Sequence, residues 1–346
     1  MATLSDIAAQ AGVSEATVSR VLNDKPGVSD AARQSVLTAL DVLGYERPAR
    51  LRRRSAGLVG LVVPELENPI FPAFAQVIED ALARRRFTPV LCTQAPGGIS
   101  EDEYVESLLD HGVSGIIFVS GRHADATADH DRYRILIERG MPVVFVNGYV
   151  PGLDAPFLST DDREAMQIAV AHLMQLGHTR IGLAAGPARY LPSSRKRETF
   201  VATLQAGLGL DEAEAAAWIQ EGLYSVEGGA AATRELVRRG ATAVVCASDL
   251  MALGAVRAAR EAGLGVPSDL SVIGYDDSAL IQFLDPPLTT IRQPVPAMGA
   301  AAVSYVVNAI EQTPVPSMEY IFRPELVLRA STGRAPRARG SATGAA

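Results

Sequence analysis

Residues 3–23 read TLSDIAAQAGVSEATVSRVLN, which contains two short helical patterns on either side of a turn at Gly12. Thr3 and Asp6 have the spacing of a capping box, which marks the start of the first helix. Ser14 is a suitable N-cap for the second helix. The apolar face of that second helix consists of Val18, Val21 and Leu22. Two short helices joined by a tight turn form a helix-turn-helix unit.

A third helix is expected between Ser29, which can cap it, and Gly44, which stops it. The second helix then presents a polar face that fits the major groove of DNA. Arg20 on this face can pair with guanine or with phosphate, and Ala16 can contact a thymine methyl group. The alternative is a small helical cap whose polar face is only solvated. The candidate DNA-binding residues of this helix are Ser14, Glu15, Ala16, Thr17, Ser19 and Arg20.

Positive charge is concentrated in the first part of the chain, although the whole chain carries a net charge of −7. Residues 1–58 hold eight Lys or Arg against six Asp or Glu, a balance of +2, which leaves −9 for the rest. Five of those eight bases lie between Arg47 and Arg54. A basic segment on an acidic body confines the attraction for phosphate to one end.

From Leu58 onward, apolar strands alternate with amphipathic helices such as Phe74–Arg86 and Met251–Ala262. Continuous apolar strands separated by helices indicate parallel sheets covered on both faces. This part is too long for one sheet, and residues 112–120 resemble residues 240–248, so we expect two sheets. The predicted strands are Leu58–Val63, Pro89–Cys92, Gly115–Val119, Val143–Val146, Ile181–Ala184, Ala243–Cys246 and Ser271–Gly274.

Polar residues follow several of these strands at their carboxyl ends, where open parallel sheets bind their ligands. Carboxylate and amide side chains suit a ligand rich in hydroxyl groups, which needs paired donors and acceptors. The residues in these positions are Glu65 to Asn68, Ser120, Asn147, Ser248, Asp249, Asp276 and Asp277.

Motifs typical of enzymes are missing: there is no glycine-rich nucleotide motif, no nucleophile elbow and no paired-histidine zinc motif. Asp276 and Asp277 are adjacent on a strand, so they point to opposite faces and cannot act on one bond. We therefore expect no enzymatic activity, no cofactor and no metal. Cys92 and Cys246 lie in apolar runs, which favours buried thiols. With no export signal and no membrane-spanning run, the expected location is the cytoplasm.

Further motifs follow residues 3–23 in order: Val28-Ser29, Leu43-Gly-Tyr45, Gly60-Leu-Val-Val-Pro64, Asn68-Pro69, Leu176-Gly-His178, Ser248-Asp-Leu-Met-Ala-Leu-Gly254, Val272-Ile-Gly-Tyr-Asp-Asp277 and Pro287-Leu-Thr-Thr-Ile-Arg-Gln293. This series closely resembles the lac/galactose-repressor family of regulators. The similarity extends from residue 2 to about residue 332.

The resemblance implies an α/β chain with an N-terminal three-helix helix-turn-helix headpiece. Two doubly wound parallel-sheet lobes of periplasmic-binding-protein type would follow. The implied parts are a headpiece (1–45), a basic hinge linker (46–57), a first lobe (58–157 and 291–318), a second lobe (158–290 and 319–331) and a disordered tail (332–346).

The resemblance also implies a repressor that reads a palindromic operator in double-stranded DNA as a homodimer and is released by a small sugar effector. The stretches 47–51 and 65–72 look most like maltose-operon repressors of actinobacteria, so the sugar would be of maltose type. Two alternatives stay open: a purine-type repressor that needs a corepressor, and a sugar-binding transport protein. The helix-turn-helix and the missing export signal argue against the second.

In the implied repressor, the second helix of the headpiece reads the operator, and Glu15 and Ala16 occupy positions that vary with operator sequence. One base among Arg195, Lys196 and Arg197 enters the effector cleft. The effector-binding residues implied by the resemblance are Asn68, Phe71, Asn147, Lys196, Trp218, Asp249 and Asp276.

The linker departs from the family pattern. In the family it folds into a hinge helix on DNA and inserts a leucine into the minor groove, which bends the duplex. Counting back from Val59 places Leu51 at that position, and Arg50 and Arg52 beside it can contact phosphates. The stretch from Tyr45 to Leu51 is shorter than usual, so a basic flexible tether is the alternative.

Overall fold

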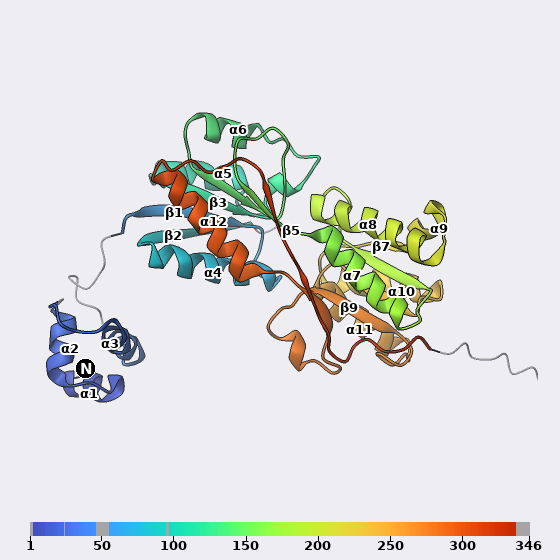
Figure 1. Cartoon of the computed structure of the whole chain (residues 1–346), viewed down its shortest axis with the longest axis horizontal. Coiled ribbons are helices and arrows are strands. Elements are labelled where there is room, and N and C mark those ends of the chain that lie inside the picture. Colours follow the sequence, from blue (N-terminus) through green and yellow to red (C-terminus); the bar gives the residue numbers. More distant parts are fainter. Residues whose placement is uncertain (1–2, 24, 46–54, 95–96, 337–346) are drawn as a thin grey trace, which may run out of the picture. The chain divides into compact units, whose positions relative to one another are not determined.

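The computed structural model describes residues 3–23, 25–45, 55–94 and 97–336. The chain divides into two compact units, residues 1–56 and residues 57–346 (Figure 1). In the described part of the chain, no helix is long and apolar enough to cross a membrane. The predicted linker residues Arg50, Leu51 and Arg52 lie outside the described residues.

The first unit is a three-helix headpiece with α1 (Leu4–Ala11), α2 (Glu15–Leu22) and α3 (Asp30–Val42). The N-caps are those that the sequence predicts, Thr3, Ser14 and Ser29, and Gly12 takes the left-handed conformation (φ 65°) that ends α1. Its fully buried side chains come from all three helices and include Ile7, Val18, Val21, Val36 and Leu40.

The second unit, which we call the body, contains two six-stranded sheets. The first has the order β11-β5-β4-β3-β1-β2 and the second the order β12-β10-β9-β8-β6-β7. All their pairings are parallel except that between β10 and β12. The strands are β1 (Gly57–Val63), β2 (Phe87–Thr93), β3 (Gly115–Val119), β4 (Val143–Val146), β5 (Phe157–Thr160), β6 (Ile181–Ala185), β7 (Ile219–Glu221), β8 (Ala243–Cys246), β9 (Ser271–Asp276), β10 (Thr289–Arg292), β11 (Glu319–Phe322) and β12 (Glu325–Val327).

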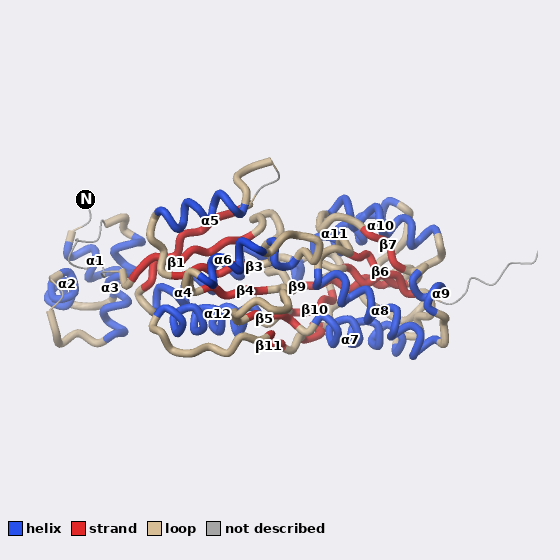
Figure 2. The backbone as a smooth tube through the Cα atoms, turned by 90° about the horizontal axis from the view of Figure 1, so that it is seen from above, coloured by secondary structure: helices blue, strands red, loops and turns tan. Residues whose placement is uncertain are grey.

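Helices cover both faces of each sheet (Figure 2). In the first lobe, α4 and α12 bury apolar side chains on one face, and α5 and α6 on the other. In the second lobe, α7 and α8 cover one face, and α10 and α11 the other. The helices of the body are α4 (Ile70–Arg84), α5 (Glu101–Asp110), α6 (Asp131–Glu138), α7 (Asp162–Gln175), α8 (Leu191–Leu208), α9 (Glu212–Ala216), α10 (Val226–Arg238), α11 (Asp249–Glu261) and α12 (Val295–Ile310), with 3-10 turns η2 (Arg122–Ala124) and η3 (Ile281–Phe283).

The chain passes from one lobe to the other after β5, after β10 and after β11. These crossings move the lobe boundaries expected from the sequence. Residues 158–160 and 319–322 belong to the first sheet, and residues 291–292 belong to the second. The predicted boundaries miss them because β5, β10 and β11 are short and of mixed polarity, without the continuous apolar runs that predict the central strands.

Residues 332–336, which the sequence assigns to a disordered tail, are described by the structure and contact the second lobe. The backbone N–H of Gly333 donates to the hydroxyl of Ser271 (3.0 Å), and that of Ala335 donates to the carbonyl of Leu176 (2.9 Å). The small and polar composition of this stretch suggests disorder, but its backbone is tied to buried polar groups of the second lobe. Residues 337–346 lie outside the described residues.

Helices α10 and α11 pack through glycines, which gives a test of the second lobe. A Cβ at Gly254 would lie 2.0 Å from the carbonyl oxygen of Val226, an atom of the backbone that cannot move aside. We predict that Gly254→Ala lowers the melting temperature by several degrees, because overpacking of this kind costs about 1–3 kcal/mol. Gly207→Ala is the matched control, since its Cβ would meet only the flexible thioether of Met174 at 2.5 Å. Equal melting temperatures for the two variants would contradict this packing.

Candidate functional site

Helix α2 presents a polar surface because its apolar residues face the headpiece core. Glu15, Ala16 and Arg20 are exposed, whereas Ser19 is half-buried. The Ser14 hydroxyl accepts from the backbone N–H of Thr17 (3.2 Å) and bonds the Thr17 hydroxyl (2.9 Å). These two hydroxyls therefore cap the helix, and the side chains at 15, 16 and 20 are the ones free to reach a partner.

The body contains a cavity of about 600 Å³ between its two lobes. Of the effector-binding residues predicted from the sequence, Asn68, Phe71, Asn147, Lys196 and Asp276 line it, together with Ser120, Tyr190 and Tyr224. Trp218 and Asp249 do not line the cavity.

Three lining residues at the carboxyl ends of strands have a positive φ that side chains rarely adopt. Ser120 follows β3 with φ 47°, Asn147 follows β4 with φ 61°, and Asp276 ends β9 with φ 124°. Such conformations cost free energy and persist only where the surrounding structure holds them, which is common at binding sites. The strand ends are thus turned so that these polar residues border the cavity.

Asp276 is a buried carboxylate with an incomplete set of partners. Its Oδ1 accepts a hydrogen bond from the Gln293 amide (2.7 Å), whereas its Oδ2 is buried and has no hydrogen-bond partner among the described residues. Burial, with the nearby charge of Asp249, raises the pKa of Asp276 well above its ordinary value. An unpaired buried carboxylate oxygen is costly, and Asp276 lines the cavity, so its carboxyl group can accept a hydrogen bond from a donor on a ligand.

A chain of hydrogen bonds connects Asp276 to the crossing between the lobes. The carbonyl oxygen of the Gln293 side chain accepts from the hydroxyl of Thr160 (2.9 Å), at the end of β5. Thr160 and Gln293 belong to two of the segments that pass between the lobes. A ligand bonded to Asp276 therefore acts on a side chain that is hydrogen-bonded, through Gln293, to the segments that connect the two lobes.

Asp249 lies behind the cavity wall and is fully partnered. Its Oδ1 accepts from the Thr290 hydroxyl (2.7 Å) and its Oδ2 from the backbone N–H of Ser278 (2.7 Å). Burial raises its pKa to about 6. The sequence interpretation of Asp249 as a ligand contact is therefore not supported by its position, because both its oxygens hold the loop after β9 against β10.

Lys196 is the base that enters the cavity. Its ammonium group pairs with Asp162 (2.5 Å) and lies 3.9 Å from the centroid of the Tyr275 ring. The Tyr275 hydroxyl donates to the same oxygen of Asp162 (2.8 Å). These three residues, all buried, form a rigid polar group beside Asp276.

The two bases that flank Lys196 are occupied elsewhere. Arg195 makes two hydrogen bonds with the carboxylate of Glu319 on β11, at 2.6 and 2.8 Å, and so connects the second lobe to the first. Arg197 pairs with Glu221 (3.2 Å). The structure thus distinguishes three adjacent bases that the sequence could not.

Trp218 packs partly buried against apolar clusters on both faces of the second sheet. Two tyrosines that the sequence analysis missed supply the aromatic wall of the cavity instead. The rings of Tyr190 and Tyr224 are 6.5 Å apart. A Cβ at Gly186 would lie 2.2 Å from the Tyr224 ring, so only glycine fits beneath it. Tyr224 follows the short edge strand β7, which no sequence pattern predicts.

The charges around the cavity disfavour an anionic ligand. The cations of the described lining are Lys196 and Arg189, and they are paired with Asp162 and Asp125 respectively. The acidic residues that line the cavity are Glu65, Glu67, Asp162, Glu227 and Asp276. Carboxylates beside aromatic rings suit a neutral ligand that carries hydroxyl groups. No group of three or more potential metal ligands occurs among the described residues.

Comparison with known proteins covers both units of the chain. Residues 3–48 match the model of bacterial regulatory proteins, lacI family, and residues 170–332 match that of a periplasmic binding protein-like domain. The HTH-type transcriptional regulator MalR of Streptomyces coelicolor is 63% identical over 338 residues, 97% of this chain and 98% of that protein.

Two solved structures resemble the whole chain. A complex of the transcriptional regulator CelR with cellobiose is 31% identical, with a TM-score of 0.71 over 96% of this chain and 100% of that one. The lac repressor dimer bound to operator and the anti-inducer ONPF is 28% identical, with a TM-score of 0.70 over 96% of this chain and 99% of that one.

Proposed function

Because this chain belongs to the lacI family of bacterial regulatory proteins, we propose that it is a repressor whose hold on operator DNA is released by a neutral sugar. Membership makes it a DNA-binding transcriptional regulator. The observation that carries the effector part of the proposal is the cavity between the lobes, with the buried carboxyl group of Asp276 in its lining.

The proposed effector is a sugar of maltose type. Neighbouring sugar hydroxyls can donate to a carboxylate, and the apolar faces of sugar rings can pack on Tyr190 and Tyr224. The cellobiose complex of the similar regulator CelR supports a disaccharide. Anionic ligands such as sugar phosphates and nucleotides fit less well, since both cations of the described lining are already paired.

We propose that two copies of the chain read a palindromic operator. The lac repressor dimer bound to operator supports this arrangement, and a two-fold DNA site requires a two-fold protein. The described body also exposes large apolar side chains on the loop around η3, with Leu280 74% and Phe283 78% exposed. Side chains of this kind are typical of surfaces that a partner covers.

Arg20 is the proposed base-reading residue. We predict that Arg20→Ala weakens binding to an operator selected from random duplexes by about 1–3 kcal/mol, as for one lost bidentate contact, and weakens binding to unrelated DNA much less. Lys25→Ala is the control, because it removes an exposed positive charge just beyond α2. Fluorescence anisotropy titrations compare the proteins. An equal loss of binding free energy on operator and on unrelated DNA would show that Arg20 contacts phosphate and not a base.

Sugar binding is predicted to release protons through Asp276. Burial raises the pKa of Asp276 well above its ordinary value of 3.8, and sugar hydroxyls that donate to the carboxylate would stabilise its charged form and lower that pKa. Maltose affinity should therefore rise with pH until the pH passes the raised value. Calorimetric titrations over a series of pH values from about pH 4 upward measure this change and the protons released.

Asp276→Asn should lose the pH dependence and bind maltose about tenfold more weakly than wild type at the pH where wild type binds best, because a charge-assisted hydrogen bond is replaced by a neutral one. Asp110→Asn, an exposed change on α5, is the control. The proposal fails if maltose, cellobiose and glucose do not bind, or if glucose 6-phosphate binds more tightly than these neutral sugars.

A further inference from the structure

We propose that residues 120–126 form a clasp between the lobes, anchored in the first lobe by Glu101 and closed on the second lobe by Asp125 and Arg189. The clasp would hold the lobes in the arrangement that encloses the effector. The contacts of the clasp stand by themselves, whereas its effect on DNA release rests on the proposed function.

Glu101 anchors the segment from beneath. The side chain belongs to the first turn of α5 and is only 3% exposed. Its carboxylate accepts from the backbone N–H of Arg122 (3.1 Å), from the Gln94 amide (3.0 Å) and from the Tyr133 hydroxyl. A Cβ at Gly121 would lie 2.4 Å from Oε2 of Glu101, so the segment approaches this carboxylate as closely as only glycine permits.

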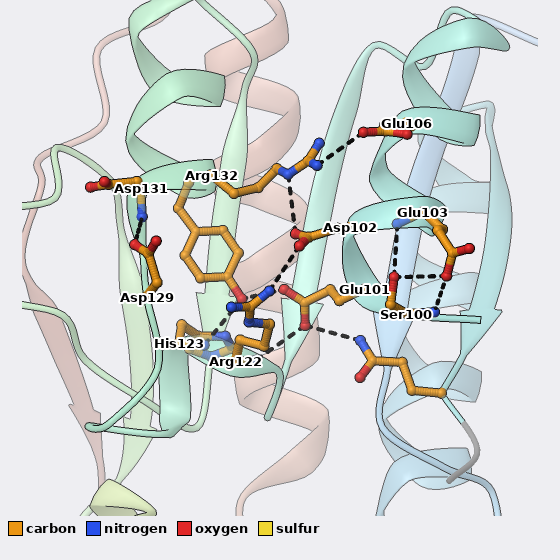
Figure 3. A network of polar contacts seen from close by, with 12 residues as sticks. Ser100, Glu101, Asp102, Glu103, Glu106, Arg122, His123, Asp129, Asp131 and Arg132 are labelled. Atoms are coloured by element: carbon orange, nitrogen blue, oxygen red, sulfur yellow. Dashed lines mark hydrogen bonds and ion pairs between the residues drawn. The ribbon is translucent and has the colours of Figure 1, made fainter. Parts of the chain in front are cut away.

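Further contacts fix η2 to the same lobe (Figure 3). The guanidinium of Arg122 pairs with Asp102 (2.9 Å), and Arg132 from α6 pairs with the other oxygen of that carboxylate (3.1 Å). The backbone N–H of His123 donates to the Tyr133 hydroxyl (3.1 Å). One ring nitrogen of His130 lies 3.1 Å from the carbonyl oxygens of both Arg122 and Asp125. The first lobe therefore presents residues 120–126 as a fixed arm.

Asp125 and Ala126 carry the contacts to the second lobe. The Asp125 carboxylate pairs with the Arg189 guanidinium (3.1 Å), and the backbone N–H of Ala126 donates to the Arg189 carbonyl (2.9 Å). The same guanidinium donates to the Tyr190 hydroxyl (3.0 Å) and lies 4.7 Å from the centroid of that ring. The clasp thus also positions one of the two tyrosines of the cavity wall.

The clasp lies at the margin of the cavity. Ser120 and Ala124 line the cavity from the arm, and Arg189 and Tyr190 line it from the opposite lobe. Movement of the lobes away from each other must break the bonds of Asp125 and Ala126. A half-exposed ion pair contributes little to folding stability, but a small free energy is enough to change the balance between two arrangements of the lobes.

The test uses Asp125, which is outside the lining of the cavity. Asp125→Asn removes the charge that faces Arg189 but keeps an oxygen for the N–H and hydroxyl of Thr127, with which Oδ1 bonds at 2.9 and 2.6 Å. Asp125→Glu keeps the charge and should restore the contact. Asp131→Asn is the matched control, because Asp131 pairs with Arg134 within α6 and makes no contact between lobes.

The first measurement is hydrogen exchange of a peptide that contains the Ala126 amide, in the full chain without sugar. Asp125→Asn should raise its exchange rate about two- to fivefold, while Asp125→Glu and Asp131→Asn stay close to wild type. Unchanged exchange in Asp125→Asn would overturn the clasp. This measurement needs no effector, so it tests whether the clasp connects the lobes even if the proposed function fails.

The second measurement is the maltose concentration that half-releases operator DNA. Asp125→Asn should raise it about two- to fivefold, with operator affinity in the absence of sugar equal to or tighter than that of wild type. If exchange rises but this concentration does not change, the clasp is not coupled to the effector. If the wild type does not respond to maltose, the proposed function fails, and the role of the clasp in DNA release fails with it.

Discussion

In a parallel sheet all strands end at one edge, and this chain brings the ends of strands from two sheets to a single cavity. The convergence of these strand ends brings together polar residues that are far apart in the sequence, which no local sequence pattern could predict. Ser120 and Asn147 come from the first sheet and Asp276 from the second, each with a positive φ. The buried, partly unpartnered carboxylate of Asp276 is the point on which the account of effector binding depends.

The central strands are predictable from the sequence because they are buried on both faces and read as unbroken apolar runs. β3, β4 and β8 have the predicted bounds. The strands β5, β7, β10, β11 and β12 escape prediction because they mix polar with apolar residues, as in Phe157–Thr160 and Thr289–Arg292, and so lack a continuous apolar run. The crossings between lobes depend on these strands, so the lobe boundaries could not be placed from the sequence.

The same limit of local sequence patterns explains which residues of the site could be predicted and which could not. Polar residues near the carboxyl ends of predicted strands, such as Asn147 and Asp276, line the cavity. The position of Trp218 depends on its neighbour β7, which has no periodic signal, and its ring packs in the core. Asp249 follows the predicted strand β8, but its partner Thr290 is on β10, so its role is visible only in three dimensions.

Release of DNA requires that the sugar bind one arrangement of the lobes more tightly than the other, because equal affinity would shift nothing. The hydrogen bonds from Asp276 through Gln293 to Thr160 connect the proposed ligand contact with the segments that pass between the lobes. The most direct test is the operator affinity of the full chain, titrated with and without saturating maltose. We predict that maltose raises the operator Kd by a factor of about 5–150. An operator Kd that is unchanged, or lowered as for a corepressor, would contradict the account.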